Sequence, residues 1–311
     1  MNTFDFLANQ QILVTGGHGF LGSHVVKLLK ENGMIEDRLQ VPSRRDFDLR
    51  ERSVCRALTK GKTLVIHLAG NVGGIGYNNE HMAEMFYDNL VMGTELMEAA
   101  RQEGVTKFVT LGTICSYPKT PPIPFNEDSL WDGYPEEITG PYGLVKKMQL
   151  VQGQVYRKQY GFNSIFLLPT NLYGPGDHST HVIAQLIDRI VTAHHEQQPR
   201  VTIWGSGKAT RDFLYVKDAA DAILKAAEHY NENAPINLGS GIETSIRELV
   251  ETIVELVKYK GEIEWDLTKP EGQPRRLLDI QRAKNAFGFS PQTSLKEGLQ
   301  QAIDWYGKKL C

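Results

Sequence analysis

The sequence predicts an α/β fold in which a doubly wound parallel sheet carries a smaller C-terminal α/β lid. Two observations lead to this prediction. Short apolar runs alternate with longer amphipathic segments in the first half of the chain, and a glycine-rich turn follows the first apolar run. Such alternation is typical of a parallel sheet with helices on both faces. The expected strands are 11–15, 38–41, 63–68, 105–111 and 164–168, and the expected helices are 21–32, 82–103 and 141–160.

Glycine and proline support the limits of these helices. Gly33 and Gly104 follow the first two helical patterns directly. Pro141 suits the first turn of the third helix, because the N–H that proline lacks would have no partner there.

The pattern changes after residue 171. A loop rich in Gly, Pro and Asp leads into a helix from about residue 182 and a strand at 201–204, and the last stretch indicates one strand and helices. We expect the two parts to interleave. The predicted sheet domain comprises residues 1–170 and about 213–238, and the predicted lid comprises residues 171–212 and 239–311.

Composition and charge argue against several classes of protein. The 311 residues have a net charge of −3, which does not favour nucleic acid. The apolar runs are far shorter than the roughly 20 residues that span a membrane, and the N-terminus lacks the features of a signal peptide. Cys55, Cys115 and Cys311 are few and widely spaced, so they predict neither a disulfide framework nor a metal site. We expect a cytoplasmic protein.

A glycine pattern joins the first strand to the first helix. Gly16, Gly19 and Gly22 form G-x-x-G-x-x-G around Phe20 and Leu21. Glycines here permit a tight turn and close approach of the backbone to a pyrophosphate, while the helix N-terminus offers free N–H groups. The strand before the pattern and the helix after it are the context that a Rossmann-type dinucleotide site requires.

The end of the second strand bears on the choice of dinucleotide. Arg44 and Arg45 follow it, and guanidinium groups suit the 2′-phosphate of NADP. Asp46 and Asp48 keep NAD open, because NAD sites usually place a carboxylate on the ribose at this point. We favour NADP(H).

Tyr142 and Lys146 form Y-x-x-x-K in the third helix, where residues four apart share a face. The ammonium should lower the pKa of the tyrosine from about 10, so that Tyr142 exchanges a proton near neutral pH. Lys146 could also hold a nicotinamide ribose. The hydroxyl of Thr113, at the end of the intervening strand, could hold the substrate oxygen that Tyr142 protonates. The alternative is a surface Tyr/Lys pair.

These features resemble the extended short-chain dehydrogenase/reductase superfamily over nearly the whole chain. Its members bind the cofactor with the N-terminal sheet and a nucleotide sugar with the lid, but they catalyse several reactions. More specific stretches are similar to the GDP-L-fucose synthase family: 72–76 with Asn78 and Asn79, 115–119, 169–175, 181–183, 204–207 followed by Arg211, and 269–272 with 274–279.

The resemblance implies an NADPH-dependent enzyme that converts GDP-4-keto-6-deoxy-D-mannose to GDP-L-fucose. The protons at C3 and C5 lie next to the C4 carbonyl, so their removal gives an enolate, and inversion needs a base and an acid on opposite faces. By resemblance Cys115 is the base and His181 the acid, while Thr113 and Tyr142 hold the enolate oxygen. The C4 ketone is then reduced, with Tyr142 as proton donor.

Two of these roles have rivals. The residues alone favour a packing role for Cys115, because cysteine is among the most buried residue types; the flanking motif and His181 favour proton transfer. His178 lies only three positions before His181, but the spacing from His181 to Arg189 matches the family better.

The resemblance also implies further contacts and a homodimer. Arg189 and Arg211 are candidates for the diphosphate, and His181 is also expected to contact the cofactor. The complete set of expected substrate contacts is Asn171, Arg189, Trp204, Arg211 and Lys269. The patterns 82–101 and 141–160 of two copies could form a four-helix bundle, or they could simply cover the sheet.

The sequence departs from the family at three places. Thr113 stands where serine is usual but keeps the hydroxyl, and His18 stands where arginine is frequent, which bears on the choice of NADP. The loop 176–180 looks short and should border the substrate, so it leaves the exact sugar open. A colitose- or heptose-type precursor therefore stays an alternative. A GDP-keto-sugar reductase that does not epimerise and a non-catalytic NADP-binding sensor are the other two.

Overall fold

The computed structural model describes residues 5–178, 181–269 and 272–310. Cys311 and parts of the expected segments 176–180 and 269–272 lie outside the described residues. Within them, no helix is both long enough and apolar enough to cross a membrane.

The larger sheet has six parallel strands in the order β2-β1-β3-β4-β5-β9. β2 and β3 lie on opposite sides of β1, so the order of the strands reverses at β1. In α/β sheets, ligands bind at the carboxyl ends of the strands beside such a switch point. The strands are β1 (Ile12–Thr15), β2 (Leu39–Gln40), β3 (Leu64–His67), β4 (Lys107–Leu111), β5 (Ser164–Pro169) and β9 (Ile236–Leu238).

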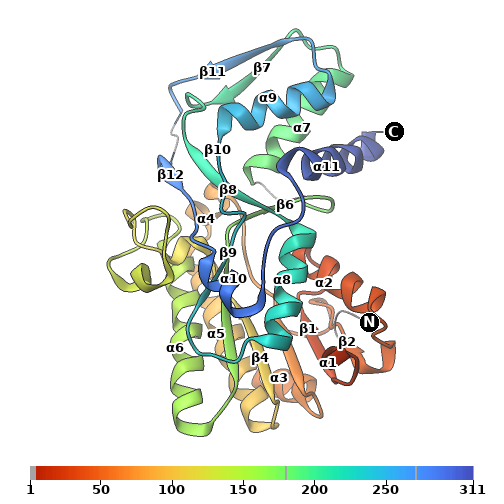
Figure 1. Cartoon of the computed structure of the whole chain (residues 1–311), viewed down its shortest axis with the longest axis vertical. Coiled ribbons are helices and arrows are strands. Elements are labelled where there is room, and N and C mark those ends of the chain that lie inside the picture. The colour runs from red at the N-terminus through yellow and green to blue at the C-terminus, as the bar shows by residue number, and fades with distance from the viewer. Residues whose placement is uncertain (1–4, 179–180, 270–271, 311) are drawn as a thin grey trace.

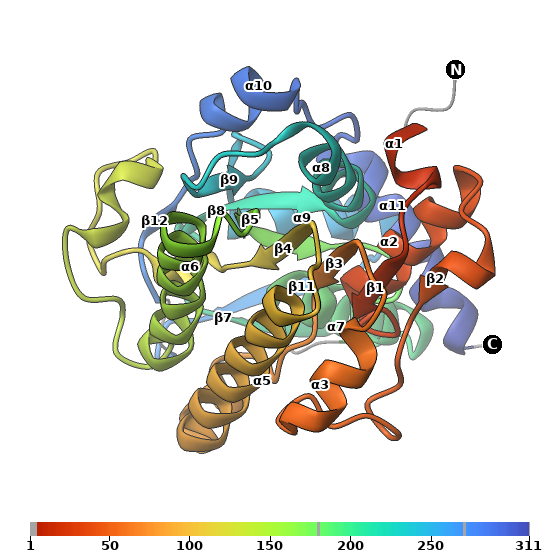
Figure 2. The same ribbon diagram turned by 90° about the horizontal axis from the view of Figure 1, so that it is seen from below.

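Helices cover both faces of this sheet (Figures 1 and 2). Ile12 and Val14 of β1 pack in one core with α2 (Phe20–Glu31) and α8 (Val216–His229). Leu13, which points the opposite way, packs in a second core with α3 (Arg52–Thr59) and α5 (Met82–Gln102). Next to α5 lies α6 (Gly140–Tyr160), and the strands are consequently buried on both sides.

The lid lies beyond the carboxyl ends of the strands, at the top of Figure 1. It has its own apolar core, formed by α7 (Val182–His195), α9 (Ile246–Val257) and α11 (Leu295–Leu310) against short strands. Ser245 and Glu248 form a capping box at the start of α9, which fixes where that helix begins. The lid strands are β6 (Asn171–Tyr173), β7 (Arg200–Trp204), β8 (Thr210–Tyr215), β10 (Glu243–Ser245), β11 (Glu262–Asp266) and β12 (Arg275–Arg276).

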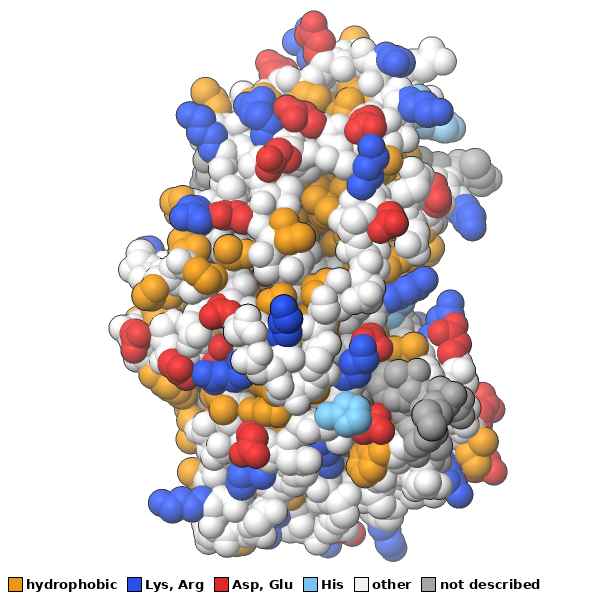
Figure 3. Space-filling view, viewed as in Figure 1, with side chains coloured by type: hydrophobic (Ala, Val, Ile, Leu, Met, Phe, Trp, Pro, Cys, Tyr) orange, Lys and Arg blue, Asp and Glu red, His pale blue; other side chains and the backbone are white. Residues whose placement is uncertain are grey.

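Short elements complete the chain: α1 (Asp5–Ala8), α4 (Ile75–Glu80), α10 (Gln281–Phe287) and the 3₁₀ turns η1 (Glu36–Arg38), η2 (Ile114–Ser116) and η3 (Glu127–Trp131). Figure 3 shows acidic and basic side chains interspersed over one face, without a large field of one sign.

The predicted fold class is confirmed, and the five strands and three helices expected in the first half are present. The prediction of a single strand in the last stretch is wrong, because β9, β10, β11 and β12 all lie there. β10 and β12 have three and two residues and no clear alternation of buried and exposed side chains, so no period could reveal them.

Candidate active site

The turn after β1 brings the N-terminus of α2 to the carboxyl end of the sheet. Gly16 has φ of +71°, and a Cβ there would lie 2.6 Å from the backbone nitrogen of Ala69. A Cβ on Gly22 would lie 2.1 Å from the Gly16 oxygen, so the helix packs directly on the turn. No side chain caps α2, whose N-cap is Gly19. The first-turn N–H groups, on Phe20, Leu21 and Gly22, therefore suit an anion.

Arg44 and Arg45 lie exposed in the turn that follows β2. Neither guanidinium forms a hydrogen bond or an ion pair with any residue that the structure describes. Asp48 is engaged, because Arg50 contacts its carboxylate at 2.7 Å and lowers its pKa through that hydrogen bond. Arg44 and Arg45 are thus available to a 2′-phosphate, whereas Asp48 is not available to a ribose hydroxyl. The residues after β2 therefore fit NADP better than an NAD held by Asp48.

Thr113, Cys115, Tyr142 and Lys146 come together beyond the end of β4. Thr113 is the N-cap of η2, where its Oγ1 accepts a hydrogen bond from the backbone N–H of Cys115 at 3.2 Å. Its hydroxyl hydrogen remains available to a substrate oxygen. Cys115 is a free, half-buried thiol.

A close backbone contact joins η2 to the first turn of α6. A Cβ on Gly143 would lie 2.2 Å from the carbonyl oxygen of Cys115, so only glycine permits this approach directly after Tyr142. Ser116 is fully buried and donates its hydroxyl to the Gly143 oxygen at 3.0 Å. Ser116 therefore ties the Cys115 turn to the Tyr142 turn.

The expected effect of Lys146 on Tyr142 is wrong for this structure. Burial, followed by the charge of nearby Cys115, raises the pKa of Tyr142, while the Lys146 Nζ lies 5.9 Å from the centre of the phenol ring. The lowered pKa was expected from the i, i+4 spacing, which does not reveal burial. Burial desolvates the phenol and disfavours the charged tyrosinate. Tyr142 accordingly stays protonated and is suited to donate.

Lys146 is only 3% exposed, and burial lowers its pKa to about 8. It makes no hydrogen bond or ion pair with the described residues. A nearly buried ammonium without such a partner fits a bound ribose hydroxyl well.

The Lys146→Met variant should unfold less readily than wild type at pH 7 when no cofactor is present. The folded pKa of Lys146 lies near 8 and the ordinary value is 10.5, so folding at pH 7 forces a charge into a desolvated place. The charge of Lys146 thus lowers the free energy of unfolding of the wild type by up to about 3 kcal/mol. This loss should disappear as the pH rises from about 8 to 10.5, because Lys146 releases its proton at a lower pH in the folded protein than in the unfolded chain. Urea unfolding of both proteins across this range measures it, with exposed Lys158→Met on the same helix as control. A pH-independent difference would contradict this assignment.

His181 occupies the N-cap position of α7 and is exposed. It lies in the lid, whereas Cys115 and Tyr142 belong to the sheet domain. Its pairing with Cys115 stays a prediction.

The structure gathers three of the expected substrate residues around one ring. The Arg189 guanidinium lies 5.7 Å and the Lys269 Nζ 5.6 Å from the centre of the Trp204 ring, which is 55% exposed. An exposed indole flanked by two cations suits a nucleotide, whose base can stack and whose phosphates are anionic.

Arg211 lies in β8 beside Arg276 of β12, its register partner. Burial, and then the charge of Arg276, lower the pKa of Arg211 to about 10. The Gln273 carbonyl accepts a hydrogen bond from Arg211, and the Gln273 side chain accepts one from Arg276. Gln273 lies outside the motifs found in the sequence, and Arg276 lies within the motif 274–279 but had no expected role of its own.

Asn171 is tied into the framework, because its amide donates to the Asp212 carbonyl at 2.9 Å. The buried Asp212 carboxylate accepts from Ser240 and from the Leu278 N–H, and burial raises its pKa to about 6. Asp212 thus joins the segments around Asn171, Ser240 and Leu278, which lie far apart in the sequence.

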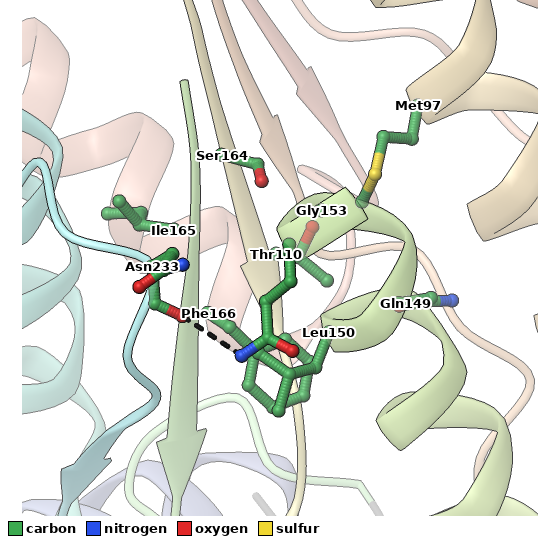
Figure 4. Close-up of a pocket in the computed structure, with 10 residues that line it drawn as sticks. Met97, Thr110, Gln149, Leu150, Gly153, Ser164, Ile165, Phe166 and Asn233 are labelled. Atoms are coloured by element: carbon green, nitrogen blue, oxygen red, sulfur yellow. Dashed lines mark hydrogen bonds between the residues drawn. The ribbon is translucent and has the colours of Figure 1, made fainter. Parts of the chain in front are cut away.

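A small cavity lies between the sheet and α6 (Figure 4). Its volume is about 10 Å³, and buried Thr110 Oγ1 and Gln149 Oε1 on its wall lack hydrogen-bond partners among the described residues. Such a space holds no more than a water molecule and is unrelated to substrate binding. No cluster of three or more potential metal ligands occurs among residues 5–178, 181–269 and 272–310.

Residues 12–239 match the model of the NAD dependent epimerase/dehydratase family. The chain belongs to this family. It is 37% identical over 307 residues to GDP-L-fucose synthase 1 of Arabidopsis thaliana, covering 97% of this chain and 94% of the relative. It is 38% identical over 304 residues to the GDP-L-fucose synthase of Sinorhizobium fredii, covering 96% of each.

A solved structure of a family member shows the same fold. The GDP-L-fucose synthetase of Naegleria fowleri bound to NADP aligns with a TM-score of 0.86 and 26% identity, over 97% of this chain and 94% of that one. This chain is also similar to the GDP-L-colitose synthase of Yersinia pseudotuberculosis.

Proposed function

We propose that this enzyme is an NADPH-dependent epimerase–reductase that converts GDP-4-keto-6-deoxy-D-mannose to GDP-L-fucose. The observation that carries the proposal is the contact between the Cys115 turn and the Tyr142 turn across Gly143. It puts a group able to take a proton from carbon beside a group able to protonate a carbonyl oxygen. The identity to GDP-L-fucose synthases over nearly the full chain supports the same reaction.

The epimerase half of the reaction uses Cys115, His181 and Thr113. Cys115 removes the proton from the carbon next to C4, and the C–H electrons move toward the C4 oxygen. The Thr113 and Tyr142 hydroxyls donate hydrogen bonds to that oxygen and hold the enolate. His181 delivers a proton to the opposite face of the carbon, so its configuration inverts.

The reductase half depends on Tyr142 and Lys146. When bound, NADPH supplies the hydride that reduces C4. Tyr142 gives its proton to the alkoxide oxygen, for which its raised pKa is suitable, since the phenol stays protonated until charge develops. The first turn of α2, Arg44, Arg45 and Lys146 hold the cofactor, and His181 contacts it as well.

The lid would bind the nucleotide part of the substrate. Trp204 with Arg189 and Lys269, and Arg211 with the neighbouring Asn171, form its contacts. We accordingly propose residues 1–170 and about 213–238 as the cofactor domain and residues 171–212 and 239–311 as the nucleotide-sugar domain. A cytoplasmic location fits the free thiols of Cys55 and Cys115.

The proposal is tested by incubating the enzyme with GDP-4-keto-6-deoxy-D-mannose and NADPH and identifying the product by NMR. GDP-L-fucose is the expected product. A colitose- or heptose-type keto sugar that turns over in its place would redirect the proposal to that substrate. Absence of turnover with every keto sugar would favour an NADP-binding sensor.

Replacing both Arg44 and Arg45 by alanine should raise the KM for NADPH about 10- to 100-fold and leave that for NADH nearly unchanged. The guanidinium groups are expected to contact only the 2′-phosphate, with charge-assisted hydrogen bonds. Steady-state kinetics with both cofactors measures the change. The exposed Arg52→Ala variant, whose guanidinium pairs with Glu95 instead, is the control. Equal losses with NADPH and NADH would refute the assignment.

We also propose a homodimer through α5 and α6. These helices lie side by side and expose large apolar side chains, among them Phe86, Tyr87, Met148 and Val155. Val155→Glu should convert a sedimenting dimer to monomer, because two carboxylates would be buried in the bundle. Ile242→Glu, an exposed position in the lid, serves as control. A monomeric wild-type enzyme at working concentration would rule out this interface.

A further inference from the structure

His24 links the cofactor helix to the loop that precedes His181. It lies on α2, one turn after Phe20, and its Nε2 is 2.8 Å from the carbonyl oxygen of Pro175. The two residues are 151 positions apart, and the contact is partly buried. The Phe20 ring meets the imidazole edge-on at 6.0 Å, and a Cβ on Gly176 would lie within 4.0 Å of both side chains. The loop is therefore packed against the first two turns of α2.

The opposite side of this loop is fixed by the lid. The Tyr306 hydroxyl of α11 donates to the Asp177 carbonyl, and the Trp305 ring meets the His178 ring at 4.7 Å. Gly174 has φ of +146° and lies so close to Val216 that a Cβ would fall 2.7 Å from Cγ1 of that side chain. His24 thus adds a polar contact from α2 to a loop that also packs against α8 and α11.

We propose that His24 is a positioning residue for epimerisation, which holds the Gly174–His178 loop, and through it His181, in register with the cofactor helix. The inference rests on the proposed role of His181 as the proton donor. His181 is the N-cap of α7 and follows His178 by three positions, so a shift of the loop displaces the candidate acid. Displacing a catalytic group by about 1 Å can slow a reaction about a hundredfold.

The hydrogen bond fixes the required chemistry at this position. The partner is a carbonyl, so Nε2 must carry a hydrogen and donate. Glutamine can donate from its amide at similar reach, whereas leucine has comparable size but no donor. His24→Gln and His24→Leu therefore separate the hydrogen bond from the filling of space.

The first measurement is proton exchange of GDP-4-keto-6-deoxy-D-mannose in heavy water with NADP⁺ present, which isolates epimerisation from reduction. His24→Leu should slow uptake of deuterium at C3 and C5 about tenfold or more, as expected for one lost hydrogen bond that also shifts the acid. His24→Gln should remain near wild type. Oxidation of GDP-L-fucose by NADP⁺, which needs Tyr142 rather than His181, should change much less in either variant. Lys27→Met, an exposed change on the same helix, is the control.

The second measurement needs no substrate. Amide hydrogen exchange of residues 174–182, followed by mass spectrometry, should accelerate in His24→Leu and stay unchanged in His24→Gln. Equal behaviour of the two variants in both measurements would overturn the inference. A wild-type enzyme that exchanges no sugar protons would instead overturn the proposed function, and accelerated amide exchange in His24→Leu alone would then still support the loop contact.

Discussion

Replacing Cys115 by serine should abolish uptake of deuterium at C3 and C5 of the keto sugar and leave measurable reduction of the ketone. Serine keeps the approximate size and the hydrogen-bonding capacity of cysteine. Its hydroxyl does not ionise near neutral pH, so it cannot serve as the base. Loss of a general base typically lowers a rate by about 10²–10⁴. The Tyr142 turn is untouched, since the contact across Gly143 involves the backbone of Cys115. His181→Gln should give the same division between the two steps.

The chain provides a matched control for this experiment. Cys55 belongs to α3, where it is fully buried and donates its thiol to the Leu49 carbonyl, far along the sequence from the site. Cys55→Ser is the same chemical change without the proposed role, and it should leave sugar-proton exchange intact. If Cys115→Ser exchanges protons as fast as wild type, Cys115 is a packing residue, which is what the residues alone favoured.

Replacing Tyr142 by phenylalanine should chiefly damage hydride transfer, again by about 10²–10⁴. The phenol that protonates the developing alkoxide is lost, whereas Cys115 and His181 remain and Thr113 still polarises the ketone. Single-turnover oxidation of NADPH, compared with deuterium uptake by the same variant, separates the two steps. Tyr160→Phe is the matched control, because Tyr160 ends the same helix and is half exposed.

The opposite pattern would be informative. If Tyr142→Phe lost exchange and reduction to the same extent, its hydroxyl would be needed first for the enolate, and the division of labour proposed here would be wrong. If all turnover were unchanged, the site would lie elsewhere.

Local patterns were sufficient for the framework of this protein. β1 and α2 could be located because an apolar run, a glycine turn and an amphipathic run follow one another within about two dozen residues. β10 and β12 were missed, because their places depend on the edges of β8 rather than on their own side chains. The pattern of residues along the chain contains little of that information.

The same limit applies to the site. Tyr142 and Lys146 were found by their spacing, but the direction of the tyrosine's pKa shift was wrong, since spacing does not reveal desolvation. Ser116 could not be assigned a role because its partner, the Gly143 carbonyl, is 27 residues away. Trp204, Arg189 and Lys269 come from three separate segments, and only the family resemblance suggested that they act together.

The central claim is that one site both inverts carbon centres and reduces the ketone between them. The most direct measurement runs the complete reaction in heavy water with GDP-4-keto-6-deoxy-D-mannose and NADPH, and reads the label by NMR. The account predicts GDP-L-fucose with deuterium at both C3 and C5 and hydrogen from the cofactor at C4. A sugar reduced at C4 with no deuterium at C3 or C5 would contradict it and identify a simple reductase.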